Sequence, residues 1–121
     1  NRKLEKNLQK EVLILQGLSH ENIVQLFDCH ESTRHIYLVL EYCAGGDLHV
    51  LLRKRGALEP RLARGLMQQL GAGMKYLWDR SLIHRDLKPQ NLLLSDQTDE
   101  AKLKIADFGF ATHLAEATMA D

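Results

Sequence analysis

Apolar residues recur every three or four positions from 4 to 18, with Lys, Glu and Gln between them. This spacing predicts an amphipathic helix that ends near Gly17. Two stretches rich in β-branched and large apolar side chains follow, Ile23 to Cys29 and Ile36 to Leu40, and a polar segment separates them. They predict an antiparallel hairpin.

The rest of the chain has mainly helical spacing and starts at a flexible break. Gly45-Gly46 ends an irregular stretch, and Asp47 can cap a short helix that stops at Gly56. Beyond Pro60, a favourable first-turn residue, apolar residues keep helical spacing to Leu77. Short apolar runs with polar connectors follow at 82–83, 92–94 and 103–106. This order predicts two lobes, with polar motifs at strand ends beside a cleft.

Composition limits the class of protein. The chain has 121 residues, 45% apolar and 26% charged, which is typical of one globular domain or part of one. Sixteen basic residues balance sixteen acidic ones, so the charge does not indicate nucleic acid or a membrane surface as the main partner. No apolar run approaches the roughly 18 residues that span a bilayer. Because Asn1 is not a starting methionine, we expect a fragment.

The two cysteines, Cys29 and Cys43, have no metal-binding spacing. Without a signal peptide, they are expected to be reduced thiols of a cytosolic protein.

Polar residues with phosphoryl-transfer chemistry follow two of the short apolar runs. The loop after 82–83 supplies Asp86, Lys88 and Asn91, and the loop after 103–106 supplies Asp107. Phosphoryl transfer needs a group that orients the attacking hydroxyl and cations that neutralise the triphosphate. Carboxylate and amide oxygens are hard ligands suited to magnesium. These residues are therefore of the types that phosphoryl transfer requires.

Two motifs carry a resemblance to a known family. Residues 84–91 read H-R-D-L-K-P-Q-N and residues 107–109 read D-F-G, which resemble the catalytic-loop and metal-binding motifs of eukaryotic protein kinases. The resemblance implies ATP and Mg²⁺ as cofactors and an incomplete bilobal α+β fold. That fold would contain part of the small-lobe sheet with its helix C, the hinge and the first half of the helical large lobe. Residues 1–40 would belong to the N-lobe, 41–46 to the hinge and 47–121 to the C-lobe up to the activation loop.

The resemblance also implies roles for single residues. Asp86 resembles the carboxylate that accepts the substrate hydroxyl proton, and Lys88 resembles the cation that steadies the transferring phosphate. Lysine at this place is typical of the serine/threonine branch. Asn91 and Asp107 resemble the two magnesium ligands. Arg85 resembles the arginine that pairs with an activation-loop phosphate, with simple loop structure as the alternative.

The first helix and the D-F-G motif suggest a regulatory arrangement. Glu11 resembles the glutamate that holds the ATP-contacting lysine, although an exposed glutamate on a helix is the alternative. Phe108 resembles a member of the regulatory column of stacked side chains, and Gly109 completes the motif. The other members of that column would be Leu15, Leu26 and His84, which is also compatible with ordinary core packing.

The segment after the predicted hairpin resembles the hinge between kinase lobes. Backbone groups of Glu41 and Cys43 would bond the adenine, with Leu40 as gatekeeper and Leu93 as the adenine floor. Asp47 resembles a ribose-binding acid, with a plain helix cap as the alternative. The sequence shows no cation beside Cys43 that would lower its thiol pKa, so it is interpreted as a hinge residue without redox chemistry.

Three further segments resemble one group of kinases, the Atg1/ULK autophagy kinases. They read E-Y-C-A-G-G-D-L at 41–48, L-M-Q-Q-L at 66–70 and K-I-A-D-F-G-F-A at 104–111. The resemblance implies a cytoplasmic serine/threonine kinase of autophagy initiation, possible recruitment to autophagosome-forming membranes, protein substrates with Ser or Thr, and autophagy regulatory partners. Thr118 occupies the place of an activating phosphothreonine. However, Ala120-Asp121 replace the expected Cys-Gly, which leaves that role open.

Several family motifs do not occur in these 121 residues: the G-x-G-x-x-G loop, the V-A-I-K lysine and the A-P-E segment. We therefore expect the chain by itself to be inactive and marginally stable, because its hairpin would expose an edge and its long helix apolar surface. The alternative function is a catalytically inactive truncated kinase that acts as a binding or regulatory protein.

Overall fold

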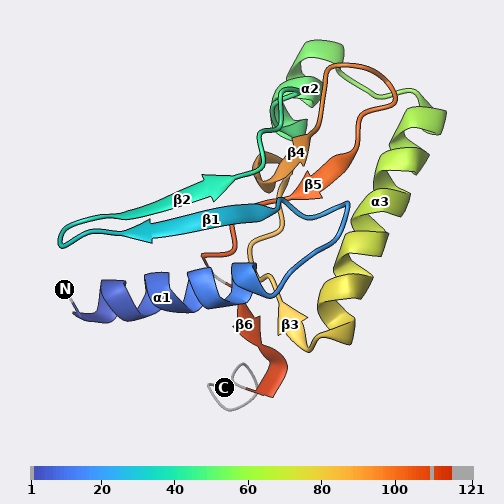
Figure 1. Ribbon diagram of the computed structural model, residues 1–121. Helices are drawn as coiled ribbons and strands as arrows, with labels where there is room; N and C mark the ends of the chain where they lie inside the picture. The colour runs from blue at the N-terminus through green and yellow to red at the C-terminus, as the bar shows by residue number, and fades with distance from the viewer. Residues whose placement is uncertain (1, 110, 116–121) are drawn as a thin grey trace.

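The computed structural model describes residues 2–109 and 111–115. Figure 1 shows a long hairpin above the first helix on one side and the longer helix α3 on the other, with short strands between them. The elements in order are α1 (Arg2–Gln16), β1 (Leu26–Glu31), β2 (Ile36–Leu40), α2 (Leu48–Arg55), α3 (Pro60–Asp79), β3 (Leu82–Ile83), the 3₁₀ turn η1 (Pro89–Asn91), β4 (Leu92–Leu94), β5 (Leu103–Ile105) and β6 (Thr112–His113).

The helix α1 forms where the apolar spacing predicted it, displaced by about two residues toward the N-terminus. Its buried stripe is Val12, Ile14, Leu15 and, just after the helix, Leu18. The helix ends in tight turns, because the N–H groups of Gly17 and Leu18 bond carbonyls three residues back.

The hairpin pairs β1 with β2 in antiparallel register from Leu26 and Leu40 to Glu31 and Ile36. The prediction that the first strand starts at Ile23 was wrong, since β1 starts at Leu26 and Ile23 and Val24 lie outside the hairpin. Ile23 forms a parallel bridge with Ile105, and the Val24 N–H donates to the Ile105 carbonyl at 3.0 Å. Burial explains the difference, because Ile23 is 1% exposed and Ile105 is 0% exposed.

The predicted helices of the second part are confirmed. The carboxylate of Asp47 accepts from the Val50 N–H at 2.9 Å and caps α2. Gly56 ends the helix in the left-handed region, with φ of 69°. Pro60 opens α3, which buries Leu66, Gly73 and Leu77.

Two nested ribbons bring distant loops together. Strand β4 pairs with β5, and β3 pairs with β6, both antiparallel. Because the inner pair lies between the strands of the outer pair in sequence, the β3–β4 loop and the β5–β6 loop must run side by side. These loops are residues 84–91 and 106–111, which carry the two polar motifs.

Large apolar side chains remain on the surface of the hairpin and of α3, as expected from the sequence. The most exposed are Phe27, Tyr37, Val39, Met67 and Trp78. No helix within the described residues is both long and apolar enough to cross a membrane. The expected α+β class is therefore present as a mixed core of helices and short strands.

Candidate active site

The loop that carries the H-R-D-L-K-P-Q-N motif, residues 84–91, is held by side chains that point back into it. The Asn91 amide nitrogen donates to the Asp86 backbone carbonyl at 2.9 Å and to its carboxylate at 3.1 Å. The Asp86 N–H in turn donates to Nδ1 of His84 at 3.1 Å. Asn91 and His84 are buried, whereas the Asp86 side chain is 25% exposed. The loop therefore presents one carboxylate to solvent with its orientation fixed.

Lys88 lies beside that carboxylate. Its ammonium is 3.7 Å from Oδ2 of Asp86, and its side chain is 51% exposed. At this distance and exposure the pair is loose, so the lysine can turn toward another anion at little cost.

The second motif is attached to the first through a buried histidine. Nε2 of His84 is 2.8 Å from the carbonyl oxygen of Ala106, and the Ala106 N–H donates to the Asn91 carbonyl at 2.9 Å. The His84 ring meets the Phe108 ring edge-on, with centroids 4.9 Å apart. Leu15 and Leu26 belong to the same buried cluster as Phe108. These contacts fix Asp107 relative to Asp86.

Two residues of the site adopt a backbone conformation that is costly for side chains other than glycine. Arg85 has φ of 70° and Asp107 has φ of 59°. Such conformations persist only where surrounding contacts impose them, and they are frequent at functional sites. Both side chains are exposed, so the strained backbone directs two charged groups outward from a buried frame.

Asp107 faces another acid, Glu11 of α1. The Glu11 pKa is raised, first by burial and then by the negative charge of Asp107. A carboxylate oxygen of Glu11 lies 3.8 Å from the position that a Cβ on Gly109 would take, and an Asp107 oxygen lies 3.3 Å from it. A side chain at position 109 would therefore be tight against the Asp107 carboxylate and in ordinary van der Waals contact with that of Glu11.

The donor set at this place fits a magnesium ion. The Asn91 amide nitrogen is turned toward Asp86, so its amide oxygen is the atom available to a cation. Asp107 adds an exposed carboxylate, and two oxygen ligands with water and phosphate oxygens are a common magnesium set. Within residues 2–109 and 111–115, no group of three or more His, Cys, Asp or Glu side chains could hold a metal. Hard amide and carboxylate oxygens suit Mg²⁺ better than a zinc-type ion, which prefers nitrogen and sulfur ligands.

The expected hinge runs along β4. Gly45 donates to the Leu94 carbonyl at 2.9 Å, and a Cβ at Gly45 would lie only 2.1 Å from the Asp96 carbonyl oxygen. Asp47 forms an antiparallel bridge with the half-buried Leu93. Glycine at 45 is required for this close approach, which brings residues 44–47 alongside β4 and the adenine-floor candidate Leu93.

The Glu41 side chain has a structural role that the sequence did not reveal. Its carboxylate accepts from the Gln25 N–H at 3.1 Å and lies 2.9 Å from the ammonium of Lys104. The Glu41 N–H donates to the Gln25 carbonyl at 2.8 Å. The Glu41 N–H, one of the backbone groups expected to bond adenine, is thus already engaged within the fold.

Cys43 is affected by the same ion pair. Burial and the Glu41 charge raise its pKa, and Lys104 lowers it by less. The expectation that no cation acts on this thiol was wrong, because Lys104 is 61 residues away in sequence but adjacent in space. The net direction is still upward, which leaves an unreactive thiol.

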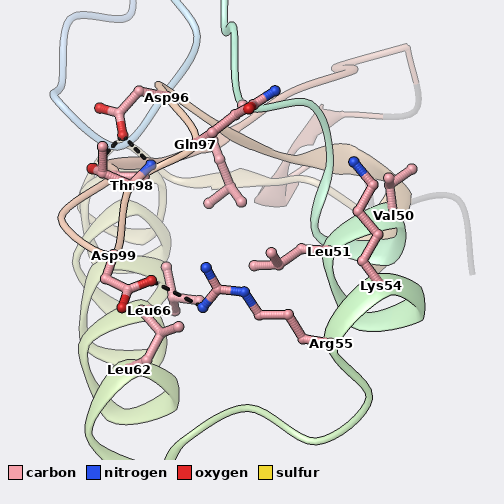
Figure 2. A pocket seen from close by; sticks show the side chains of 13 residues that line it. Val50, Leu51, Lys54, Arg55, Leu62, Leu66, Asp96, Gln97, Thr98 and Asp99 are labelled. Carbon is pink, nitrogen blue, oxygen red and sulfur yellow. Dashed lines mark hydrogen bonds and ion pairs between the residues drawn. The ribbon is translucent and has the colours of Figure 1, made fainter.

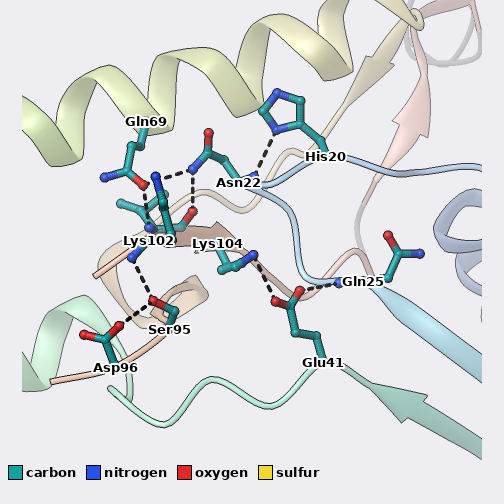
Figure 3. A network of polar contacts seen from close by, with 10 residues as sticks. His20, Asn22, Gln25, Glu41, Gln69, Ser95, Asp96, Lys102 and Lys104 are labelled. Carbon is teal, nitrogen blue, oxygen red and sulfur yellow. Dashed lines mark hydrogen bonds and ion pairs between the residues drawn. The ribbon is translucent and has the colours of Figure 1, made fainter. Parts of the chain in front are cut away.

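A buried polar network behind the site was also missed by the sequence analysis (Figure 3). The Asn22 amide nitrogen donates to the Leu103 carbonyl at 2.9 Å and to Oε1 of Gln69 at 3.1 Å. Gln69 also accepts from the Leu103 N–H at 2.8 Å, and the Ile105 N–H donates to the Asn22 carbonyl at 2.8 Å. The network fixes β5 between the α1–β1 connection, which contains Asn22, and α3, which contains Gln69. Polar residues in apolar segments were its only signal in the sequence.

A separate pocket lies away from these residues, between α2, α3 and the β4–β5 connection (Figure 2). Leu51, Leu62 and Leu66 form apolar walls, and the Arg55 guanidinium points across them to Asp99 at 2.9 Å. None of the candidate catalytic residues lines this pocket.

Thr118, the other regulatory candidate, lies outside the described residues.

The nested ribbons, the catalytic loop and the D-F-G turn together define a protein kinase domain. The family model for the protein kinase domain matches residues 1–121, and the chain therefore belongs to this family. The expected incomplete bilobal kinase fold is confirmed by this match.

Within the family, the chain is similar to Atg1 and ULK kinases, as the motifs indicated. It is 49% identical over 121 residues to serine/threonine-protein kinase ATG1c of Arabidopsis thaliana, covering 100% of this chain and 16% of that protein. It is 47% identical over 109 residues to serine/threonine-protein kinase ULK3 of Homo sapiens, covering 90% and 23%. It is 40% identical over 169 positions to serine/threonine-protein kinase atg1 of Penicillium rubens, covering 100% and 18%. The chain thus spans between 16% and 23% of these relatives.

Proposed function

We propose that this chain carries the catalytic-loop and metal-binding residues of a magnesium- and ATP-dependent serine/threonine protein kinase of autophagy initiation. The observation that carries the proposal is the fixed arrangement of three residues on two adjacent loops. Asn91 is bonded to Asp86, and Asp107 is attached to the same frame through His84 and Ala106. Identity to Atg1 and ULK kinases over nearly the whole chain supports the subgroup.

In this function, Asp86 orients the substrate hydroxyl and accepts its proton as the oxygen attacks the γ-phosphorus of ATP. The bond from the γ-phosphorus to the bridging oxygen breaks, and ADP leaves. Lys88, loosely paired with Asp86 in this structure, turns to the transferring phosphoryl group and balances its charge.

The metal-binding residues are Asn91 and Asp107, which would hold Mg²⁺ through their oxygens. The ion supplies positive charge at the β- and γ-phosphate oxygens when it is bound. Glu11, beside Asp107, is the residue positioned to hold a phosphate-contacting lysine. The Asp107 charge helps to raise the Glu11 pKa, and a cation bound near these two carboxylates would offset their repulsion.

Adenine would bind at the hinge, 41–46. The Glu41 carbonyl and the Cys43 backbone are the proposed polar contacts, with Leu40 and Leu93 on the apolar faces. Asp47 would accept from the ribose with the carboxylate oxygen that does not cap α2. Residues 1–40 would form part of the N-lobe, and residues 47–121 the first part of the C-lobe.

The regulation and location that we propose are those implied by the resemblance to Atg1 and ULK kinases. Arg85 is exposed on its strained backbone and would pair with a phosphate on the activation loop, for which Thr118 is the candidate. We place the protein in the cytoplasm, with recruitment to autophagosome-forming membranes through autophagy regulatory proteins. Its substrates would be proteins with Ser or Thr hydroxyls.

The test is transfer of radiolabelled γ-phosphate from ATP to a generic protein substrate by the full-length protein. We expect Asp86→Asn and Asp107→Asn each to lower turnover by at least about 10²-fold. Asp99→Asn, which removes only an exposed ion pair, is the matched control and should leave turnover unchanged. Thermal melting of all variants excludes unfolding as the cause.

The results also decide against the alternative function. If the wild-type protein transfers no phosphate while it still binds a regulator, the chain belongs to an inactive binding protein. Full turnover in Asp107→Asn would overturn the metal assignment.

A further inference from the structure

A basic hollow separates α1 from the β3–β6 ribbon. Its volume is about 490 Å³. Lys6, Lys10 and Leu13 line it from α1, and Arg80, Leu82 and His113 line it from the other part of the chain. Figure 1 shows α1 passing above β6 and β3, near the last turn of α3, so the hollow lies at the junction of three elements. We refer to the space lined by these six residues, together with Gln9, Ile14, Gly17 and Leu18, as the α1–β6 hollow.

The centre of the hollow is apolar. Ile14, Leu18 and Leu82 are buried and form its floor. Leu13 is 70% exposed at its edge, whereas Val12, Ile14 and Leu15 of the same helix are buried. An exposed leucine over an apolar floor is a surface that an apolar side chain would cover with a favourable free energy.

The edge of the hollow is basic. Among the lining residues that the structure describes, the side chains with a formal charge at neutral pH are the cations Lys6, Lys10 and Arg80. Two of these cations are already fixed in place. The Lys10 ammonium donates to the Thr112 hydroxyl at 2.9 Å, and the Arg80 guanidinium lies 4.5 Å above the Tyr76 ring. Because these side chains are already ordered, binding an anion costs less side-chain conformational entropy.

We propose that the α1–β6 hollow is a docking surface for an acidic protein segment that carries a large apolar side chain. The apolar side chain would cover Leu13 and the floor, and flanking carboxylates would pair with Lys6 and Arg80. Charge complementarity selects this occupant, because an apolar segment without acids would offer no anion to Lys6 and Arg80.

Docking there would also act on the catalytic site. A bound segment touches α1 and the β3–β6 ribbon together, as the Lys10 to Thr112 bond already does. It would therefore stabilise the position of α1 in which Glu11 lies beside Asp107. This regulatory consequence rests on the proposed kinase function, whereas the docking itself does not.

The experiment measures docking without ATP. A fluorescein-labelled peptide with a central Phe-Leu pair flanked by glutamates is titrated with the full-length protein, and Kd is read from fluorescence anisotropy. We expect the double variant Lys6→Glu/Arg80→Glu to weaken binding by at least about tenfold, since it replaces attraction by repulsion. Leu13→Asp should weaken it in the same way. Lys54→Glu, an exposed charge reversal on α2, is the control and should bind like the wild type.

Three results with the Phe-Leu peptide would overturn the proposal. They are absence of peptide binding by the wild-type protein, equal binding by the double variant, and an equal loss in Lys54→Glu. A peptide with serines in place of Phe-Leu that binds as tightly would show a simple anion site instead, which also overturns it. Because anisotropy needs no phosphoryl transfer, a failed kinase assay leaves this outcome unaffected.

Discussion

The ammonium of Lys104 lies 2.9 Å from the carboxylate of Glu41, and the two side chains are 11% and 25% exposed. The pair joins β5, which leads directly into Asp107, to the segment that follows β2. The proposed adenine-binding and metal-binding regions are therefore connected by one largely buried ion pair (Figure 3). Removing one partner would leave the other charge without compensation.

Lys104→Met tests this connection. We expect a loss of about 1–3 kcal/mol in the free energy of unfolding, less than for a fully buried pair because Glu41 is partly exposed. Urea unfolding followed by circular dichroism measures it. Lys102 is exposed and directly precedes β5, so Lys102→Met should change the free energy of unfolding by less than about 0.5 kcal/mol. Adding Glu41→Gln to Lys104→Met should recover part of the loss, and an additive loss would contradict the pair.

Glu11→Gln should stabilise the fold at neutral pH. The Glu11 pKa is raised above its ordinary value of 4.5, so the folded state binds this proton more tightly than the unfolded state. Ionised Glu11 therefore costs stability, and the cost disappears as the pH falls below 4.5. The expected gain should be present in urea unfolding at neutral pH and absent below 4.5. A gain that is equal at both pH values would refute the electrostatic explanation.

Two glycines of α3 should respond oppositely to the same substitution. A Cβ at Gly73 would lie 2.8 Å from Cδ1 of Ile105 and 3.2 Å from the Asn22 carbonyl oxygen, whereas Gly71 has nothing within 4 Å. We expect Gly73→Ala to cost about 1–3 kcal/mol through overpacking. Gly71→Ala should instead stabilise by about 0.5–1 kcal/mol through helix propensity. Thermal melting compares the two, and stabilisation by both would show that β5 does not pack tightly on the helix.

Cys43 should react slowly with iodoacetamide. Burial, with the Glu41 charge, raises its pKa above the ordinary value of 9.0, so little thiolate exists at neutral pH. Mass spectrometry of alkylated peptides should show faster labelling in urea than in the folded protein. Lys104→Met should slow folded-state labelling further, because that ammonium lowers the pKa. Faster labelling of folded Lys104→Met at unchanged stability would argue against this assignment.

Much of the local structure could be predicted because it depends on nearby residues. The spacing of apolar side chains in α1 and α3, the Asp47 cap and the Gly56 stop act within a few residues. The start of β1 could not be predicted, because Ile23 fits a strand as well as Leu26 does. Its partner is Ile105, 82 residues away, and burial against that residue decided the outcome.

For the candidate site, the sequence by itself predicted which groups would carry the chemistry. Asp86, Lys88, Asn91 and Asp107 stand in two contiguous motifs, and the resemblance of these motifs to those of protein kinases implies the proposed base, cation and metal ligands. Only the tertiary structure decided how these groups are held. The Lys104–Glu41 pair, the Asn22–Gln69 network and the facing of Glu11 and Asp107 each join residues from separate elements. Burial and electrostatic strength depend on distance in space, which the order of residues along the chain does not contain.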